Sequence, residues 1–219
     1  MHYSQDIDGV LDSPVGQHGL SRASLDRNMA GLMPALDRIR HWHDSNELPP
    51  DPTAYAEVVK RATRGIECKL IFEPGRLIVG NAGILVTRVI YVKRGEAKTF
   101  VIADAAMNDL VRPTLYEAYH QILPVTEPKS GAPRQVADVV GPVCESGDFL
   151  ALDREMPAAA TGDLLAVMTA GAYGAVQAGT YNTRALIPEV LVHNGEWALV
   201  RPRLEADQLI GLDRMPGWL

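Results

Sequence analysis

The sequence predicts a mainly β protein with helices near its N-terminus. Before Gly65, apolar residues recur at spacings of three and four, which is the period of an amphipathic helix. After Gly65, short apolar runs alternate with Gly and Pro, a pattern typical of strands joined by tight turns. Many short strands with this punctuation indicate an antiparallel barrel or sandwich, which we expect between residues 83 and 203.

Two helices are expected in the N-terminal part. The first begins near Ser24, and its apolar face consists of Leu25, Met29, Leu32, Leu36 and Ile39. A proline-rich break precedes the second helix, for which Asp51 is a suitable N-cap and Pro52 a suitable first residue. Its apolar face would be formed by Tyr55, Val58, Val59 and Ala62. A further short helix is expected at 205–210.

Seven strands are expected after Gly65, at residues 68–72, 83–93, 98–103, 134–140, 163–169, 185–192 and 196–201. The second and third of these flank Arg94–Ala97, which would close a hairpin. The last two flank Asn194–Gly195, a strong signal for a two-residue turn.

Composition and charge restrict the class of protein. The 219 residues are 47% hydrophobic and 22% charged, so a packed soluble domain is expected. A net charge of −6 without a basic run argues against nucleic acid as the partner. No apolar stretch approaches the roughly 18 residues that span a bilayer, and the first residues lack the features of a signal peptide. Two distant cysteines form no disulfide framework, so a cytoplasmic protein is expected.

A thiol and a carboxylate stand side by side in Gly141–Asp148, directly after the apolar run 136–140. The Gly and Pro residues around them indicate a loop, where Cys144 and Glu145 could both face one pocket. Such a pair would suit a proton donor beside a carboxylate that binds a cation. The alternative is that Cys144 is a small buried apolar residue.

A second candidate site follows the predicted strand 68–72 and consists of Glu73, Pro74, Gly75 and Arg76. Gly75 would let backbone N–H groups approach an anion, and Arg76 offers a planar fork of donors for a carboxylate or phosphate. The alternative is a tight turn with a surface ion pair.

Further candidate residues lie elsewhere in the chain. Arg112 and Tyr116 are four residues apart, so on a helix they would share a face and could bind one carboxylate; a solvated arginine is the alternative. Tyr173 could stack on a planar cofactor, bond its phosphate, or be a core aromatic. His41 and His43 would face apart on a helix, so we do not expect a metal site there.

Four motifs, in this order, closely resemble the C-terminal part of the diaminopimelate decarboxylase family: residues 73–76, 104–116, 141–148 and 171–174. In this pyridoxal-phosphate family an N-terminal (β/α)8 barrel holds the cofactor and a C-terminal β-barrel completes the site. The resemblance implies that residues 46–82 are a remnant of the (β/α)8 barrel (a helix, the last strand and its loop). It also implies that 83–219 form the C-terminal β-barrel domain and that 1–45 are an unmatched helical segment.

The resemblance implies a role for each motif in converting meso-2,6-diaminopimelate to L-lysine. The implied contacts of pyridoxal 5'-phosphate are Glu73, Pro74, Gly75, Arg76 and Tyr173. The implied contacts of the substrate are Arg76, Arg112, Tyr116, Glu145 and Tyr173. Cys144 would donate a proton after carbon dioxide leaves, and Glu145 would bind the distal ammonium group. In the family both residues reach into the neighbouring subunit's site, so a homodimer is the expected catalytic unit.

The cofactor lysine and the Gly-rich phosphate loop of the family are not found in this sequence. Its five lysines lie outside the family's cofactor motif: Lys60, Lys69, Lys93, Lys98 and Lys129. We interpret the chain as a natural truncation, an internal deletion or a gene fragment. Two hypotheses follow: a diaminopimelate decarboxylase that is inactive without a complementing barrel fragment, or a non-catalytic β-barrel module that pairs with itself or with a relative.

Overall fold

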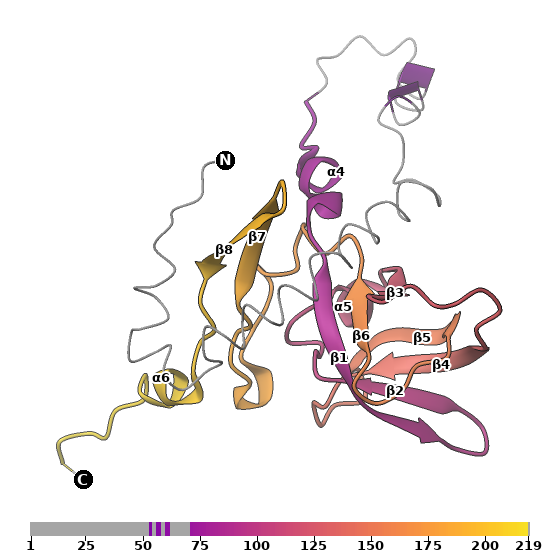
Figure 1. Ribbon diagram of the computed structural model, residues 1–219. Coiled ribbons are helices and arrows are strands. Elements are labelled where there is room, and N and C mark those ends of the chain that lie inside the picture. Colours follow the sequence, from indigo (N-terminus) through magenta and orange to yellow (C-terminus); the bar gives the residue numbers. More distant parts are fainter. Residues whose placement is uncertain (1–52, 54–55, 58–59, 62–70, 219) are drawn as a thin grey trace.

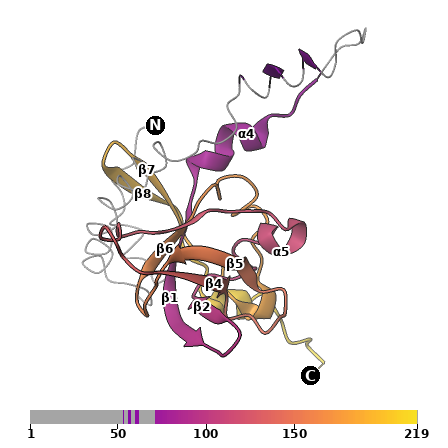
Figure 2. The same cartoon turned by 90° about the vertical axis from the view of Figure 1, so that its right-hand side faces the viewer.

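The computed structural model of this chain describes residues 53, 56–57, 60–61 and 71–218. Six strands form one sheet, in the order β3-β6-β1-β2-β4-β5. Their bounds are β1 Leu85–Arg94, β2 Thr99–Ala103, β3 Ile122–Pro124, β4 Arg134–Val140, β5 Phe149–Pro157 and β6 Leu164–Val167. The edge strands β3 and β5 contact each other, so the sheet wraps into a nearly closed barrel (Figures 1 and 2).

Strand β1 changes its partner along its length, and this change curves the sheet. Residues 85–88 pair with β6, whereas the part from Val89 to Arg94 pairs with β2. The register with β2 shifts between Val89 and Tyr91, and such irregularities bend a strand. One strand therefore belongs to both walls of the barrel.

Alternating side chains of the strands fill the barrel interior, as the two-residue period of a strand requires. The fully buried core includes Val89, Val101, Leu110, Val139, Leu150, Met156, Leu165 and Val167. Thr87 is a polar residue inside this core, and its hydroxyl donates to Asp104 Oδ1 at 2.6 Å and accepts from the Ala105 N–H at 2.9 Å. Because the hydroxyl both donates and accepts a hydrogen bond, the burial of Thr87 leaves no unpaired polar group.

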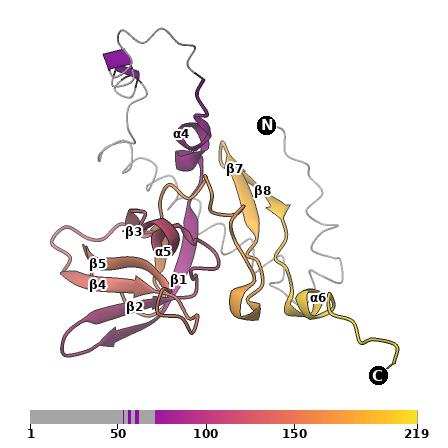
Figure 3. The same cartoon turned by 180° about the vertical axis from the view of Figure 1, so that it is seen from behind.

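A separate two-stranded hairpin consists of β7 (Glu189–His193) and β8 (Glu196–Arg201). It stands beside β1, as the front and rear views show (Figures 1 and 3), and a groove of about 1060 Å³ lies between them. Asn194 and Gly195 both have positive φ, 49° and 83°, as a two-residue hairpin turn of this kind requires. Helix α6 (Ala206–Ile210) follows the hairpin.

The mainly β fold class is confirmed, and so are most of the predicted strands. β4 and β8 have the predicted bounds, and β1, β2, β6, β7 and α6 overlap their predicted ranges. Two strands were not predicted, β3 and β5. β3 is only three residues long, and β5 contains the charged stretch 153–155, which interrupts the alternation of apolar and polar residues. The parallel pairing of β2 with β4 is a further departure from the expected antiparallel barrel.

The strand predicted at 68–72 is not found in its described part, because Ile71 and Phe72 are exposed and belong to no strand. The predicted helix from Ser24, the residue Cys68 and the pair His41 and His43 lie outside the described residues. Within the second predicted helix, the described residues are helical and exposed: Thr53, Ala56, Glu57, Lys60 and Arg61. No helix within the described ranges is long and apolar enough to cross a membrane.

Candidate functional site

The segment that carries Arg76 is a short helix followed by a single 3-10 turn, α4 (Gly75–Val79) and η1 (Gly80–Ala82). The N–H of Ile78 donates to the Pro74 carbonyl at 3.1 Å, which closes the first turn of α4. Arg76 is exposed on this segment, and a Cβ at Gly75 would meet nothing within 4 Å. The space beside Gly75 is therefore open, and the predicted approach of an anion to its backbone stays a prediction.

The turn after β6 packs closely against α4 and η1. The N–H of Gly171 donates to the Gly80 carbonyl at 3.0 Å, and the N–H of Ala170 donates to the Gly83 carbonyl at 2.8 Å. A Cβ at Gly171 would overlap the carbonyl oxygen of Val79. Only glycine permits this approach, and it holds the turn that carries Tyr173 against the segment that carries Arg76.

Tyr173 has a left-handed backbone, with φ of 62°, and its side chain is 48% exposed. A bulky residue in this region of φ is uncommon and costs conformational energy. The alternative of a core aromatic is excluded by this exposure, and the phenol ring is accessible to a ligand.

Arg112 lies at the start of a second short helix, α5 (Arg112–Tyr116). Pro113 suits the first turn, where no N–H donor is needed, and Glu117 ends the helix in a left-handed conformation with φ of 52°. Arg112 is only 8% exposed, so the alternative of a solvated arginine is wrong, whereas Tyr116 on the same helix is exposed.

The Arg112 guanidinium donates to His120 Nε2 at 3.1 Å. Among the described residues, no carboxylate lies within ion-pair distance of Arg112. Burial lowers the pKa of Arg112 from its ordinary value, the charge of Arg76 lowers it further, and Tyr116 and Tyr173 raise it. Three other predicted site residues, Arg76, Tyr116 and Tyr173, therefore interact electrostatically with the buried Arg112.

The loop 141–148 carries Cys144 and Glu145, and both are exposed on it. The buried carboxylate of Asp148 shapes this loop, because it accepts hydrogen bonds from the Val143 N–H at 2.6 Å and from the Met107 N–H at 2.7 Å. The loop predicted from Gly and Pro is thus confirmed, and Cys144 is not a buried apolar residue.

The side chain of Glu145 is held at both oxygens. Tyr181, in the 3-10 turn η2 (Tyr181–Thr183), donates from its hydroxyl to Glu145 Oε2 at 3.2 Å, and the Gly147 N–H donates to Oε1 at 3.3 Å. The hydrogen bond to Glu145 is the main cause that raises the pKa of Tyr181. The Glu145 carboxylate is therefore fixed in direction while it stays accessible.

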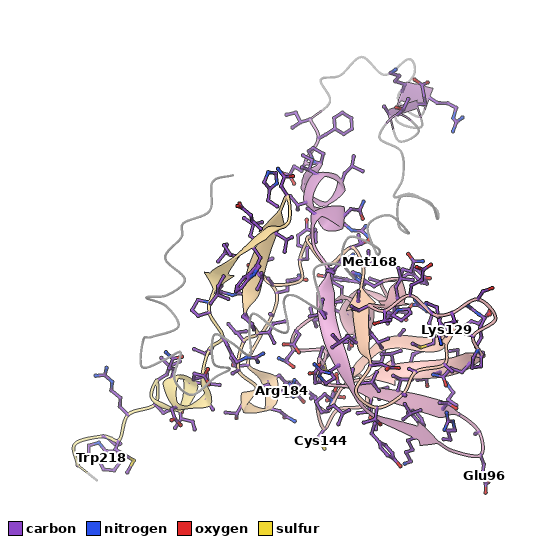
Figure 4. The ribbon with its side chains drawn as sticks, in the orientation of Figure 1. Glu96, Lys129, Cys144, Met168, Arg184 and Trp218 are labelled. Atoms are coloured by element: carbon purple, nitrogen blue, oxygen red, sulfur yellow. The ribbon has the colours of Figure 1, made fainter. Side chains whose placement is uncertain are left out.

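Six of the predicted site residues fall into two groups within one chain. We call Arg76, Arg112, Tyr116 and Tyr173 the arginine group, and Cys144 with Glu145 the thiol group. Thr114 of α5 donates to the Gly147 carbonyl at 2.5 Å, which ties the loop of the thiol group to the helix of Arg112. Nevertheless, Cys144 lies far below Met168 in Figure 4, and Met168 is the residue whose carbonyl holds His120 beside Arg112.

Four residues of the site were missed from the sequence: Thr114, His120, Asp148 and Tyr181. Asp148 ends the motif that was singled out, and its acidic side chain after Gly147 was a usable signal. His120 and Tyr181 meet their partners across eight and 36 residues, and no local pattern marks such contacts.

The fold and the arginine group define a class of protein. A family model described as "Pyridoxal-dependent decarboxylase, C-terminal sheet domain" matches residues 4–171, and the chain belongs to this family. Family members that resemble it are pyridoxal-phosphate-dependent diaminopimelate decarboxylases, and the one from Zymomonas mobilis is 49% identical over 181 residues, which are 83% of this chain and 42% of that protein.

Solved structures support the same relationship. Diaminopimelate decarboxylase from Helicobacter pylori, complexed with L-lysine, aligns with a TM-score of 0.63 and 38% identity over 76% of this chain and 41% of that one. The enzyme from M. jannaschii aligns with a TM-score of 0.68 and 33% identity over 80% of this chain and 41% of that enzyme. The chain thus spans about two fifths of the length of these relatives.

Proposed function

We propose that this chain supplies the substrate-binding and proton-donating half of a diaminopimelate decarboxylase, which converts meso-2,6-diaminopimelate to L-lysine. The observation that carries the proposal is the buried guanidinium of Arg112, for which the described residues provide no carboxylate partner. A buried cation without a counter-ion is costly, and a carboxylate ligand would compensate it. The other residues of the arginine group act electrostatically on Arg112: Arg76 lowers its pKa, and Tyr116 and Tyr173 raise it.

The described residues fit pyridoxal 5'-phosphate. Glu73, Pro74, Gly75 and Arg76 present an open backbone and a cation, and Tyr173 presents an accessible phenol ring. When bound, the cofactor supplies an electron sink for the negative charge left on the substrate carbon by loss of carbon dioxide. The protein's own task is to orient the reacting carboxylate and to deliver a proton.

Each group has its own part in this task. Arg112 and Tyr116 bind and orient a substrate carboxylate, with Arg76 adding positive charge to the same site. The thiol of Cys144 holds the proton that replaces carbon dioxide. Glu145, aligned by Tyr181, accepts the distal ammonium group of the substrate.

We infer a homodimer as the catalytic unit, and the placement of the two groups supports this inference. In Figure 4 Cys144 lies below Met168, whose carbonyl holds His120 beside Arg112, and we propose that the thiol of one copy serves the arginine group of its partner. A twofold axis produces two equivalent shared sites of this kind. A cytoplasmic role in lysine synthesis accords with this proposal.

We expect the purified chain to release no carbon dioxide by itself. None of its five lysines lies in the family's cofactor motif, and at least two are engaged elsewhere: Lys60 contacts Glu57 at 2.9 Å, and Lys98 contacts Asp138 and Asp153, each at 3.0 Å. Without a lysine that binds the cofactor covalently, the cofactor is not retained in a reactive form. Manometric or isotopic assay of carbon dioxide from diaminopimelate checks this, and robust release by the chain alone would contradict it.

The decisive experiment combines the chain with the barrel part of the Zymomonas relative and pyridoxal phosphate. We expect an absorbance band near roughly 420 nm, a property of the bound cofactor, together with carbon dioxide release. Arg112→Gln should abolish release, and the matched control Arg94→Gln, at an exposed position at the end of β1, should not.

Mixed variants then test whether the site is shared. Arg112→Gln and Cys144→Ser should each be inactive, yet mixing them should restore about a quarter of the activity, because one site of each heterodimer is intact. If both residues served one chain's site, mixing would restore nothing. The second hypothesis, a non-catalytic sheet module, predicts a stable complex with neither absorbance band nor carbon dioxide release.

A further inference from the structure

His120 is a buried residue to which no role is assigned by the proposed reaction. It is 1% exposed and lies in the segment between α5 and β3. Both of its ring nitrogens have a partner: Nδ1 lies 2.8 Å from the Met168 carbonyl oxygen, and Nε2 lies 3.1 Å from Arg112 Nη1. The imidazole therefore links the turn after β6 to the guanidinium of the arginine group.

The two partners together dictate where the protons of the ring are. A backbone carbonyl only accepts hydrogen bonds, so Nδ1 of His120 must carry a proton. A guanidinium only donates, so Nε2 must offer its lone pair to Arg112. One tautomer satisfies both conditions, the neutral ring with its proton on Nδ1.

The electrostatic surroundings favour the same neutral form. Burial is the largest cause that lowers the pKa of His120, and the charges of Arg112, Arg76 and Arg154 lower it further. The hydrogen bond to the Met168 carbonyl acts in the opposite direction. The ring thus stays an acceptor for Arg112 through the neutral pH range.

A neutral hydrogen-bond acceptor differs from a carboxylate because it does not neutralise the positive charge of the arginine. An aspartate or glutamate would hold the guanidinium equally well, but it would also neutralise the charge that an anionic ligand needs. An imidazole fixes the direction of one N–H and leaves the positive charge uncompensated. The remaining donors of Arg112 stay available, because the guanidinium carries five N–H groups in total.

We propose that His120 is a positioning residue: as a neutral Nδ1–H imidazole it orients Arg112 without neutralising it, and so keeps the guanidinium ready for a carboxylate. This inference rests on the proposed function in one respect, that Arg112 is the group that binds the carboxylate.

The first test measures the tautomer directly in the purified chain. Long-range ¹H–¹⁵N NMR spectra of the histidine rings, assigned with His120→Gln, should show a protonated Nδ1 and an unprotonated Nε2 for His120. The pattern should persist as the pH is lowered to the point where an exposed imidazole is protonated. A proton on Nε2, or a ring that is charged at neutral pH, would overturn the proposal.

The second test measures the charge left on Arg112, with acetate as the carboxylate probe. Titration at constant ionic strength should shift the Arg112 Nε resonance of the wild type. Because an amide also has an acceptor, His120→Gln should keep most of this response. His120→Glu should lose it roughly tenfold or more through neutralisation, and His120→Phe should weaken it through loss of the acceptor.

The control is His193→Gln, which removes an exposed imidazole on β7 and should change nothing. A purely structural role predicts instead that all folded variants at position 120 bind acetate equally, and that result would overturn the proposal. The proposal would also be overturned if acetate did not shift the Arg112 Nε resonance of the wild type. Failure of diaminopimelate decarboxylation in the reconstituted enzyme, with the NMR and acetate results intact, would count against the proposed function alone.

Discussion

At the scale of single residues, the site depends on buried polar groups that face a few accessible ones. Asp148, His120 and Arg112 are almost fully buried and hydrogen-bonded, whereas Cys144 and Tyr173 are exposed. The buried members give the exposed members a fixed position, since a buried polar group with its partners satisfied has few alternative arrangements. Substitutions at the two kinds of position should therefore have different effects.

Cys144 should react quickly with a thiol reagent in the native protein, because it lies exposed on the loop 141–148. Reaction with an aromatic disulfide, followed by absorbance, should show a fast phase that Cys144→Ser removes. The control Cys68→Ser should leave that phase in place. Labelling should be repeated at high dilution, because association of the chain could cover Cys144. A fast phase that remains in Cys144→Ser would refute the assignment of that phase to Cys144.

The buried His120 should make the protein less stable as the pH falls. Its pKa in the folded state lies below the ordinary value of 6.5, mainly because of burial. Below pH 6.5 the unfolded chain takes up a proton that the folded chain refuses, so unfolding becomes easier, by at most ~1.4 kcal/mol per pH unit until the folded ring is protonated too.

Urea denaturation between neutral pH and pH 5, in wild type and His120→Gln, measures this effect. The fall in the free energy of unfolding should be smaller in the variant, whereas His193→Gln should follow the wild type. Equal pH dependence of all three proteins would show that His120 is not held neutral.

At the scale of elements, loops tied to one another position the side chains of the site. The turn after β6 is hydrogen-bonded through the backbone to Gly80 of η1 and to Gly83, and α5 is bound to the loop 141–148 through Thr114. The helices themselves are only five residues long, too short to be stable alone. Their positions are therefore set by tertiary contacts at the ends of the β-strands.

Gly171→Ala should destabilise the protein by roughly 1–3 kcal/mol, as for other overpacked sites. The added Cβ would overlap the backbone carbonyl of Val79, which has no rotamer through which to move away. Gly179→Ala is the matched control, because its Cβ would meet nothing within 4 Å. Free energies of unfolding from urea curves compare the two, and a similar loss in both would contradict the close approach of the turn and α4.

At the scale of the whole molecule, large apolar side chains are exposed around the arginine group. Ile78 on α4 is 68% exposed, Leu115 on α5 is 56% exposed, and Tyr116 and Tyr119 are exposed as well. Large exposed apolar side chains are often covered by a partner when they form a patch. The chain is therefore expected to associate through the exposed apolar side chains of α4 and α5.

Sedimentation equilibrium should show association of the purified chain at a concentration of about 0.1 mM, since the exposed apolar surface favours it. The double substitution of Ile78→Glu and Leu115→Glu should weaken association. Ile210→Glu, on the exposed helix α6, should not. A monomer across the whole range, without binding of a dye for apolar surface, would contradict the expectation.

Local chemistry was sufficient to predict much of this protein. Alternating and clustered apolar residues predicted β4 and β8 with their bounds, because strand period and turn residues are local properties. Gly and Pro predicted an accessible loop around Cys144 for the same reason. The motifs of the arginine group were likewise visible in the sequence.

Tertiary structure alone decided the burial and the partners of these residues. Arg112 read alone suggested a solvated cation, yet it is buried against His120, eight residues away. The parallel pairing of β2 with β4 and the change of partner along β1 depend on contacts between distant segments. Such contacts produce no local sequence pattern, because they depend on the packing of the whole barrel.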